Sequence, residues 1–218
     1  MERVITVRGK GVKRVSPDTI EINFTVKAQD ASYDNMIKLS EEQLIAMQNA
    51  VERTGFKKKQ LRTQNYRIHT VYRDVKKENG EYENVFSGYE CKQEFLLKFP
   101  MDIQKFNSVL RSIDICEARP LFDINFTLSN SQEARDEALR DAAINAHREA
   151  ELITEAAGAH LGDLLKIDLT DNCYSFRSMG VNSVSTASSA SLSIDTTGTM
   201  QPDNITVEVS AEFIWEIK

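Results

Sequence analysis

The sequence predicts a two-layer α+β protein in which antiparallel or mixed sheets are packed by three helices. Apolar and polar residues alternate in several segments, which is the period-two pattern of strands with one face in water. Three other segments carry their apolar residues at the spacing of an amphipathic helix. The order of these segments is β-β-α-β-β-α-β-α-β-β.

The chain begins with two predicted strands and a helix. Residues 3–14 are rich in β-branched side chains, and Gly9 and Gly11 within them indicate a bulge or a close approach of another backbone. A proline-containing turn separates this strand from a second one over residues 20–27. Apolar residues then recur at helical spacing over residues 31–54, which predicts the first helix.

A hairpin and a second helix follow. Residues 61–72 predict a strand, and the charged stretch 73–84, which contains Asn79-Gly80, predicts an exposed hairpin tip. The aromatic residues of the returning strand alternate with polar ones, so we interpret them as core. Asp102 is placed to cap a short helix, and a further strand follows Pro120.

The third helix is the clearest one. Alanine recurs at every fourth residue from Ala134 to Ala150, and Asn130 is placed to cap the start of the helix. Small residues at this spacing let a helix lie close to a sheet or to another helix. Residues 161–169 predict another strand, and strict alternation from residue 205 to the end predicts the last.

The order of elements predicts one domain with two lobes. Residues 20–128 contain β-α-β-β-α-β, the split βαβ unit of a ferredoxin-like core. We expect a single domain over residues 1–218, with an inner lobe at about 60–128. The terminal strands and the helix at 130–158 make the other lobe.

Residues 171–200 break the pattern, because they are rich in Ser, Thr, Asn and Gly. A loop of this length inside a domain is usually functional or disordered, and we expect a flexible loop here. Tyr174, Phe176 and Met179 are its candidate ligand or interface residues, as an apolar lid over a cleft.

Composition limits the partners and the cellular compartment that we expect for this protein. The net charge of −6 disfavours a nucleic-acid partner. No apolar run reaches the roughly 18–20 residues of a transmembrane helix. The first residues lack the features of a signal peptide, so the sequence as it stands predicts a cytoplasmic protein, and a periplasmic or exported one if a leader was removed.

A search for catalytic motifs yields no candidate. The three histidines, His69, His147 and His160, have no metal-ligand spacing, and the cysteines form no C-x-x-C pair. No nucleophile elbow or phosphate-binding glycine loop is present. The sequence therefore predicts no catalytic residue, no cofactor and no metal, and we expect a protein that is not an enzyme.

Several segments together resemble the SIMPL-domain family, a domain of unknown function. They are the opening strand 5–11 with the turn 16–18, Gly88-Tyr89-Glu90, the alanine-rich helix from Asp136 and the closing strand from Ile205. The resemblance implies a family that includes periplasmic and oxidative-stress defence proteins, and it suggests a homo-oligomer, since at least one relative is similar to a channel-like ring assembly. No catalytic residues are established for the family, so the resemblance implies none here.

Three hypotheses follow from these observations. The first is a non-enzymatic assembly or binding protein linked to the cell envelope or to stress, with sheet edges and the 171–200 loop as interfaces. The second is a small-molecule or lipid binder with a cleft under that loop. The third is an uncharacterised enzyme, which a site formed by His69, Cys91 or carboxylates would support.

Overall fold

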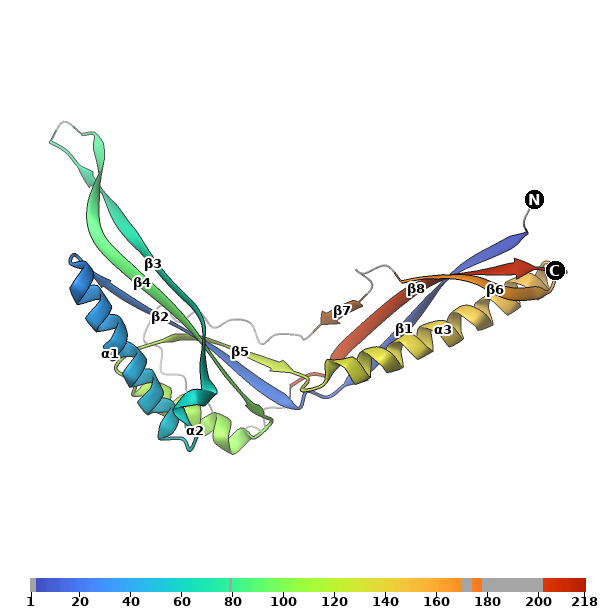
Figure 1. The fold of residues 1–218 in the computed structure, drawn as a ribbon, viewed down its shortest axis with the longest axis horizontal. Helices are drawn as coiled ribbons and strands as arrows, with labels where there is room; N and C mark the ends of the chain where they lie inside the picture. Colours follow the sequence, from blue (N-terminus) through green and yellow to red (C-terminus); the bar gives the residue numbers. More distant parts are fainter. Residues whose placement is uncertain (1–2, 79, 170–173, 178–201) are drawn as a thin grey trace. The chain divides into compact units, whose positions relative to one another are not determined.

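The computed structural model describes residues 3–78, 80–169, 174–177 and 202–218, and it confirms the α+β class (Figure 1). The described residues form two compact units, each with one sheet of four strands. Of the described residues, the first unit contains 3–18, 126–169, 174–177 and 202–218. The second unit contains residues 19–125.

The first unit is a sheet packed by one long helix. Its strands lie in the order β1-β8-β6, and β7 also pairs with β8. The elements are β1 (Val4–Val15), α3 (Ser131–Ala156), β6 (Leu161–Asp168), β7 (Tyr174–Arg177) and β8 (Ile205–Ile217). β1 and β8 pair antiparallel from Val4↔Glu216 to Val15↔Ile205, which places the last strand in the middle of this sheet and the first strand at its edge.

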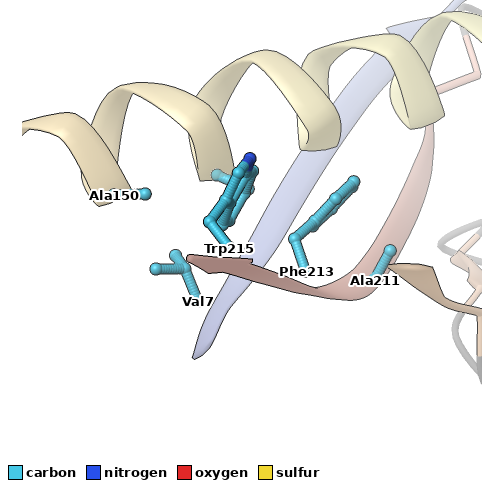
Figure 2. Packing of buried hydrophobic residues seen from close by; sticks show 6 residues of the cluster. Val7, Ala150, Ala211, Phe213 and Trp215 are labelled. Carbon is cyan, nitrogen blue, oxygen red and sulfur yellow. The ribbon is translucent and has the colours of Figure 1, made fainter. Parts of the chain in front are cut away.

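The alanines predicted at every fourth position of α3 form its buried face. Ala138, Ala142 and Ala146 have no exposed surface. Ala146 packs with Val7, Phe213 and Trp215 in one cluster, and Ala138 packs with the valines of β8 in a second one. Figure 2 shows Phe213 and Trp215 beside α3. The centroids of the two rings are 5.5 Å apart, and the ring planes are inclined by 18°.

Gly9 and Gly11 lie directly under α3, as their position within a strand predicts. A Cβ atom built on Gly9 would lie 2.1 Å from the carbonyl oxygen of Ala142. One built on Gly11 would lie 1.8 Å from the carbonyl oxygen of Ala138. Both contacts are with helix backbone, so the two glycines set how closely α3 approaches β1.

The second unit is a sheet with the order β3-β4-β2-β5, packed by two helices. Its elements are β2 (Thr19–Asp30), α1 (Tyr33–Glu52), a 3₁₀ turn η1 (Lys58–Gln60), β3 (Leu61–Lys76), β4 (Tyr82–Pro100), α2 (Ile103–Asp114) and β5 (Leu121–Thr127). They follow the β-α-β-β-α-β order on a single sheet; the assignment of a ferredoxin-like core stays a prediction. The unit begins at residue 19 rather than 60 because β2 pairs with β4 along its whole length, Thr19↔Pro100 to Asp30↔Tyr89.

The hairpin tip is shorter than the charged stretch 73–84 suggests. β3 runs to Lys76 and β4 begins at Tyr82, and the two strands pair from Tyr82 and Lys76 inwards. An ion pair between Lys77 Nζ and Glu83 Oε2, at 3.0 Å, lies at the end of this ladder. Charged side chains point to water from both strands, so a charged stretch is compatible with a paired hairpin.

The predicted caps of the second and third helices are confirmed. The Asp102 side chain accepts a hydrogen bond from the backbone N–H of Lys105 at 3.0 Å. The Asn130 side chain accepts one from the backbone N–H of Gln132 at 3.2 Å. Each bond satisfies one of the donors that the first turn of a helix leaves unpaired.

Candidate functional site

The core of the second unit contains a buried polar network. Ser40 of α1 and Gln93 of β4 are 1% and 2% exposed. The Gln93 side-chain amide donates to the Ser40 carbonyl oxygen at 2.8 Å and to Ser40 Oγ at 2.5 Å. Ser40 Oγ also lies 3.4 Å from Cys91 Sγ and 3.5 Å from the Tyr66 hydroxyl. This network ties α1 to the middle of the sheet.

The Tyr66 hydroxyl lies at the outer end of that network and has a shifted pKa. Its hydrogen bond with Ser40 lowers the pKa of Tyr66, but burial of the hydroxyl and the neighbouring Cys91 thiol raise it more, so the pKa lies above its ordinary value. A tyrosine with a raised pKa stays neutral at physiological pH. The hydroxyl therefore contributes hydrogen bonding rather than charge.

His69 and Cys91, the residues named for an enzyme hypothesis, lie on opposite faces of the sheet. His69 is opposite Glu90 in the β3–β4 register, and Ile68 is opposite Cys91. Because neighbouring residues of a strand point to opposite faces, the imidazole and the thiol point apart. His69 Nε2 lies 3.7 Å from Glu90 Oε1, which also pairs with Lys27 Nζ at 3.2 Å.

The other histidines lie in the first unit. His147 Nδ1 is 3.5 Å from Glu151 Oε2, one helical turn away. The His147 ring lies edge-on to the Trp215 ring, with 6.2 Å between the ring centroids. The backbone of His160 exchanges two hydrogen bonds of 2.8 Å with Lys218. Across the described ranges, no three His, Cys, Asp or Glu side chains are grouped as metal ligands would be.

Exposed aromatic side chains gather where the β3–β4 hairpin passes the start of α1. We call Tyr33, Tyr72, Phe86 and Tyr89 the aromatic strip. Neighbouring rings meet edge to face. The distance between ring centroids is 5.8 Å for Tyr72 and Phe86, 5.3 Å for Phe86 and Tyr89, and 5.4 Å for Tyr89 and Tyr33. Tyr33, Tyr72 and Phe86 keep 47%, 55% and 45% of their surface exposed.

Gly88 makes this strip continuous. Its φ is +137°, and a Cβ atom there would lie 2.4 Å from the carbonyl oxygen of Asp30. Glycine thus lets β4 pass against the corner between β2 and α1, which brings Tyr89 to Tyr33. The register shift between Val71 and Tyr72 occurs at the same level, because Val71 is opposite Gly88 and Tyr72 is opposite Phe86.

Our interpretation of the returning-strand aromatics as core is confirmed for Phe95 and Phe99, which are 1% and 3% exposed. It does not extend to Phe86, which lies near the tip of the hairpin and, like Tyr72 opposite it on β3, stays about half exposed. Alternation gives the face on which a side chain lies and not how far the helices cover that face. The exposed strip is apolar surface that has the form of a binding site.

The candidate ligand residues of the Ser/Thr-rich segment are only partly described. Tyr174 and Phe176 lie in β7, opposite Val209 and Val207 of β8. Met179 and most of the predicted loop over 171–200 lie outside the described residues. The lid and the cleft beneath it therefore stay predictions.

Comparison with known proteins gives one family and two relatives that carry the same name. The family model SIMPL, protein of unknown function (DUF541), matches residues 5–215. The chain is 23% identical over 163 residues to the 26 kDa periplasmic immunogenic protein of Brucella melitensis biotype 1. It is equally similar to the protein of that name from Brucella abortus strain S19. The match covers 75% of this chain and 65% of each relative, so the chain spans less than two thirds of their length.

Proposed function

This chain belongs to the SIMPL family, and from that premise we propose that it is a non-enzymatic binding or assembly protein of the bacterial envelope. The aromatic strip is the observation that carries the proposal. Four rings, each in contact with the next and three of them about half exposed, form a contiguous apolar surface. Aromatic residues dominate the binding energy of protein interfaces.

The size of the strip indicates how it would be used. Full burial of one large apolar side chain contributes roughly 1.5–3 kcal/mol, and three of these rings are about half buried already, so each of the three offers about 1 kcal/mol on binding. The strip then supplies about 3 kcal/mol, whereas association costs an estimated 4–15 kcal/mol of lost freedom. The strip would serve as the anchor of a larger interface, with the polar hairpin around it as the rim.

The polar side chains of the second unit support a role without catalysis. Ser40 already donates to or accepts from three side chains within the core, and Glu90 lies between Lys27 and His69 on the opposite face. These bonds connect α1, β2, β3 and β4. We assign them to holding the sheet and helix together.

The name of the relatives supports the envelope part of the proposal. Both are called periplasmic, which favours the exported alternative over the cytoplasmic one for this chain. None of the described helices is long and apolar enough to cross a membrane. Fractionation of the native organism into periplasm, membrane and cytoplasm, followed by immunoblotting, tests the location; a purely cytoplasmic protein contradicts it. The link to oxidative stress stays a prediction from the family.

Site-specific photo-cross-linking in living cells tests the binding role. We expect p-benzoylphenylalanine in place of Tyr72 to give discrete adducts on irradiation. The additional substitution Phe86→Ser should reduce the yield of these adducts. The matched control places the same probe at Ile45, an exposed residue of α1 outside the strip that is 54% accessible. No adduct from position 72, or the same adducts from position 45, would count against the strip as the binding surface.

A further inference from the structure

The outer strand of the second sheet has a free edge. In the described part of the chain, β3 stands first in the order β3-β4-β2-β5 and pairs with β4 on one side (Figure 1). In an antiparallel pair, every second residue directs its backbone N–H and C=O away from the partner strand. β3 therefore offers a row of backbone donors and acceptors along its 16 residues, and such a row is a template for a further strand.

One face of this edge carries a row of arginines. Ile68 is opposite the buried Cys91, which contacts α1, so the preceding residue, Arg67, points to the face away from the helices. The alternation of β3 and β4 places Arg62 and Arg73 on that same face. All three arginines are exposed.

The carboxylates nearest to this row already have other partners. On the same face of β4, Glu94 forms an ion pair with Lys92, and Glu90 forms one with Lys27 of β2. Across the described ranges, no carboxylate forms an ion pair with any of the three arginines of the row. The row is therefore positive charge that the second unit itself does not neutralise.

The other face of the same edge is largely apolar. Tyr66 and Tyr72 keep 50% and 55% of their surface exposed, and Ile68 between them is partly buried. Tyr72 also belongs to the aromatic strip. Because a strand directs alternate side chains to its two faces, a strand added here would need acidic residues on one face and apolar residues on the other.

The charge of the edge selects a partner other than a second copy. From residue 61 to residue 73, β3 contains three arginines and no acidic residue, so this part of a second copy would bring only like charge. Basic side chains on an edge strand guard against pairing between copies in this way. An acidic strand does not meet that barrier. The row is also a local feature, since the chain as a whole has a net charge of −6.

We propose that β3 binds an extended acidic segment of another protein as an added strand. Carboxylates at alternate positions of that segment face Arg62, Arg67 and Arg73. The side chains between them pack on Tyr66 and Tyr72. The inference rests on the proposed binding function and deepens it, because it names the class of partner that reaches the aromatic strip. Addition of a strand to a sheet edge is a common mode of peptide recognition.

Fluorescence anisotropy with a labelled peptide tests the proposal on the whole chain. The probe is a peptide of about 12 residues, enough to extend from Arg62 to Arg73, with glutamate at odd positions and valine or threonine at even ones. We expect it to bind saturably. A control peptide of the same composition has its glutamates in adjacent pairs, which divides the charge between both faces of a strand. It should bind at least about tenfold more weakly.

Exchange of charge tests the role of the arginines. Each of Arg62→Glu, Arg67→Glu and Arg73→Glu should weaken binding of the glutamate peptide by roughly threefold to tenfold, because an opposite-charge pair becomes a like-charge pair. The triple variant should lose that peptide and bind instead the same peptide with lysine in place of glutamate. Binding of the lysine peptide also shows that the triple variant is folded.

A matched variant controls for total charge. Lys38→Glu, Arg111→Glu and Arg148→Glu together reverse three exposed basic residues outside β3 and give the same net charge as the triple edge variant. This control should bind the glutamate peptide as the wild type does. In the wild type, amide hydrogen exchange within β3 should slow when the glutamate peptide is added, because the new strand covers N–H groups that β4 leaves free.

Four results would overturn the inference. The first is no saturable binding of the glutamate peptide at protein concentrations up to about 1 mM. The second is equal binding of the two peptides, or of an oligothymidylate, which would make the edge a general anion surface. The third is an equal loss of binding in the edge variant and the matched variant.

The fourth result separates this inference from the proposed function. Photo-adducts from position 72 that survive the triple edge reversal would leave the binding role of the aromatic strip standing. They would exclude β3 as the edge that the partner pairs with.

Discussion

Replacing Gly11 with alanine should destabilise the first unit, although the same change in an uncrowded strand would stabilise it. Glycine in a strand interior costs about 0.5–1 kcal/mol relative to alanine. At Gly11 the new Cβ atom would lie 1.8 Å from the Ala138 carbonyl oxygen and 2.7 Å from the Ala142 nitrogen. Both atoms are helix backbone, so the methyl group fits only if α3 moves.

The cost of that movement exceeds the gain. Overpacking a close-packed core usually costs about 1–3 kcal/mol, and a clash with backbone on a single helix belongs at the upper end. We therefore expect Gly11→Ala to lower the free energy of unfolding by about 2–3 kcal/mol. For a chain of this length that corresponds to a fall in Tm of roughly 4–12 °C.

Trp215 provides the assay. It is the one tryptophan in the sequence, it is 4% exposed, and it lies in the cluster between α3 and β8. Its fluorescence during urea or thermal unfolding therefore reports on the first unit. Val12→Ala, next to Gly11 but on the open face and 41% exposed, is the control and should change stability by about 0.5 kcal/mol or less. A Tm for Gly11→Ala equal to or above that of the wild type would refute the close approach of α3 to β1.

Two more predictions concern polar groups of the second unit. Ser40→Ala should destabilise by about 1–2 kcal/mol in urea unfolding, because Gln93 loses one of its two buried partners; an unchanged midpoint would show that the network is not needed. Hydrogen bonds from Lys92 and then Asn65 hold the pKa of Glu94 below its ordinary value. The stability that Glu94 contributes is therefore present above the ordinary pKa of a glutamate and is lost as the pH falls through the lowered pKa. Glu94→Gln should therefore reduce the loss of stability on acidification from pH 5 to 3, and identical urea midpoints against pH for variant and wild type would contradict this.

Much of the fold could be predicted because its signals are local. The alternation in β8, the four-residue spacing of the α3 alanines and the caps at Asp102 and Asn130 each depend on residues close together in the chain. Periodicity and capping report on such local geometry directly. The glycines of β1 left two alternatives open, a bulge or a close approach of another backbone, and the structure shows the close approach.

The aromatic strip could not be predicted in the same way. Tyr33 belongs to a helix and Tyr89 to a strand 56 positions later, and they meet because Gly88 passes Asp30. The one available signal was Gly88-Tyr89 itself, since a glycine inside a strand pattern indicates a close approach. Nothing in the sequence around Tyr72 separates a half-exposed aromatic residue from a core one.

By itself, then, the sequence determined the α+β class, the order of the elements apart from β7, and the buried faces of α2 and α3, because each of these follows from the periodicity of side chains along the chain. The buried face of α1 differs from the predicted one, since Met36 and Ser40 are buried and Tyr33 is 47% exposed. Only the tertiary structure decided which strands are neighbours. It paired the first strand with the last, left β6 at an edge and brought four aromatic rings together. The physical reason is that pairing and exposure depend on contacts between residues distant in sequence, whose partners no local pattern specifies.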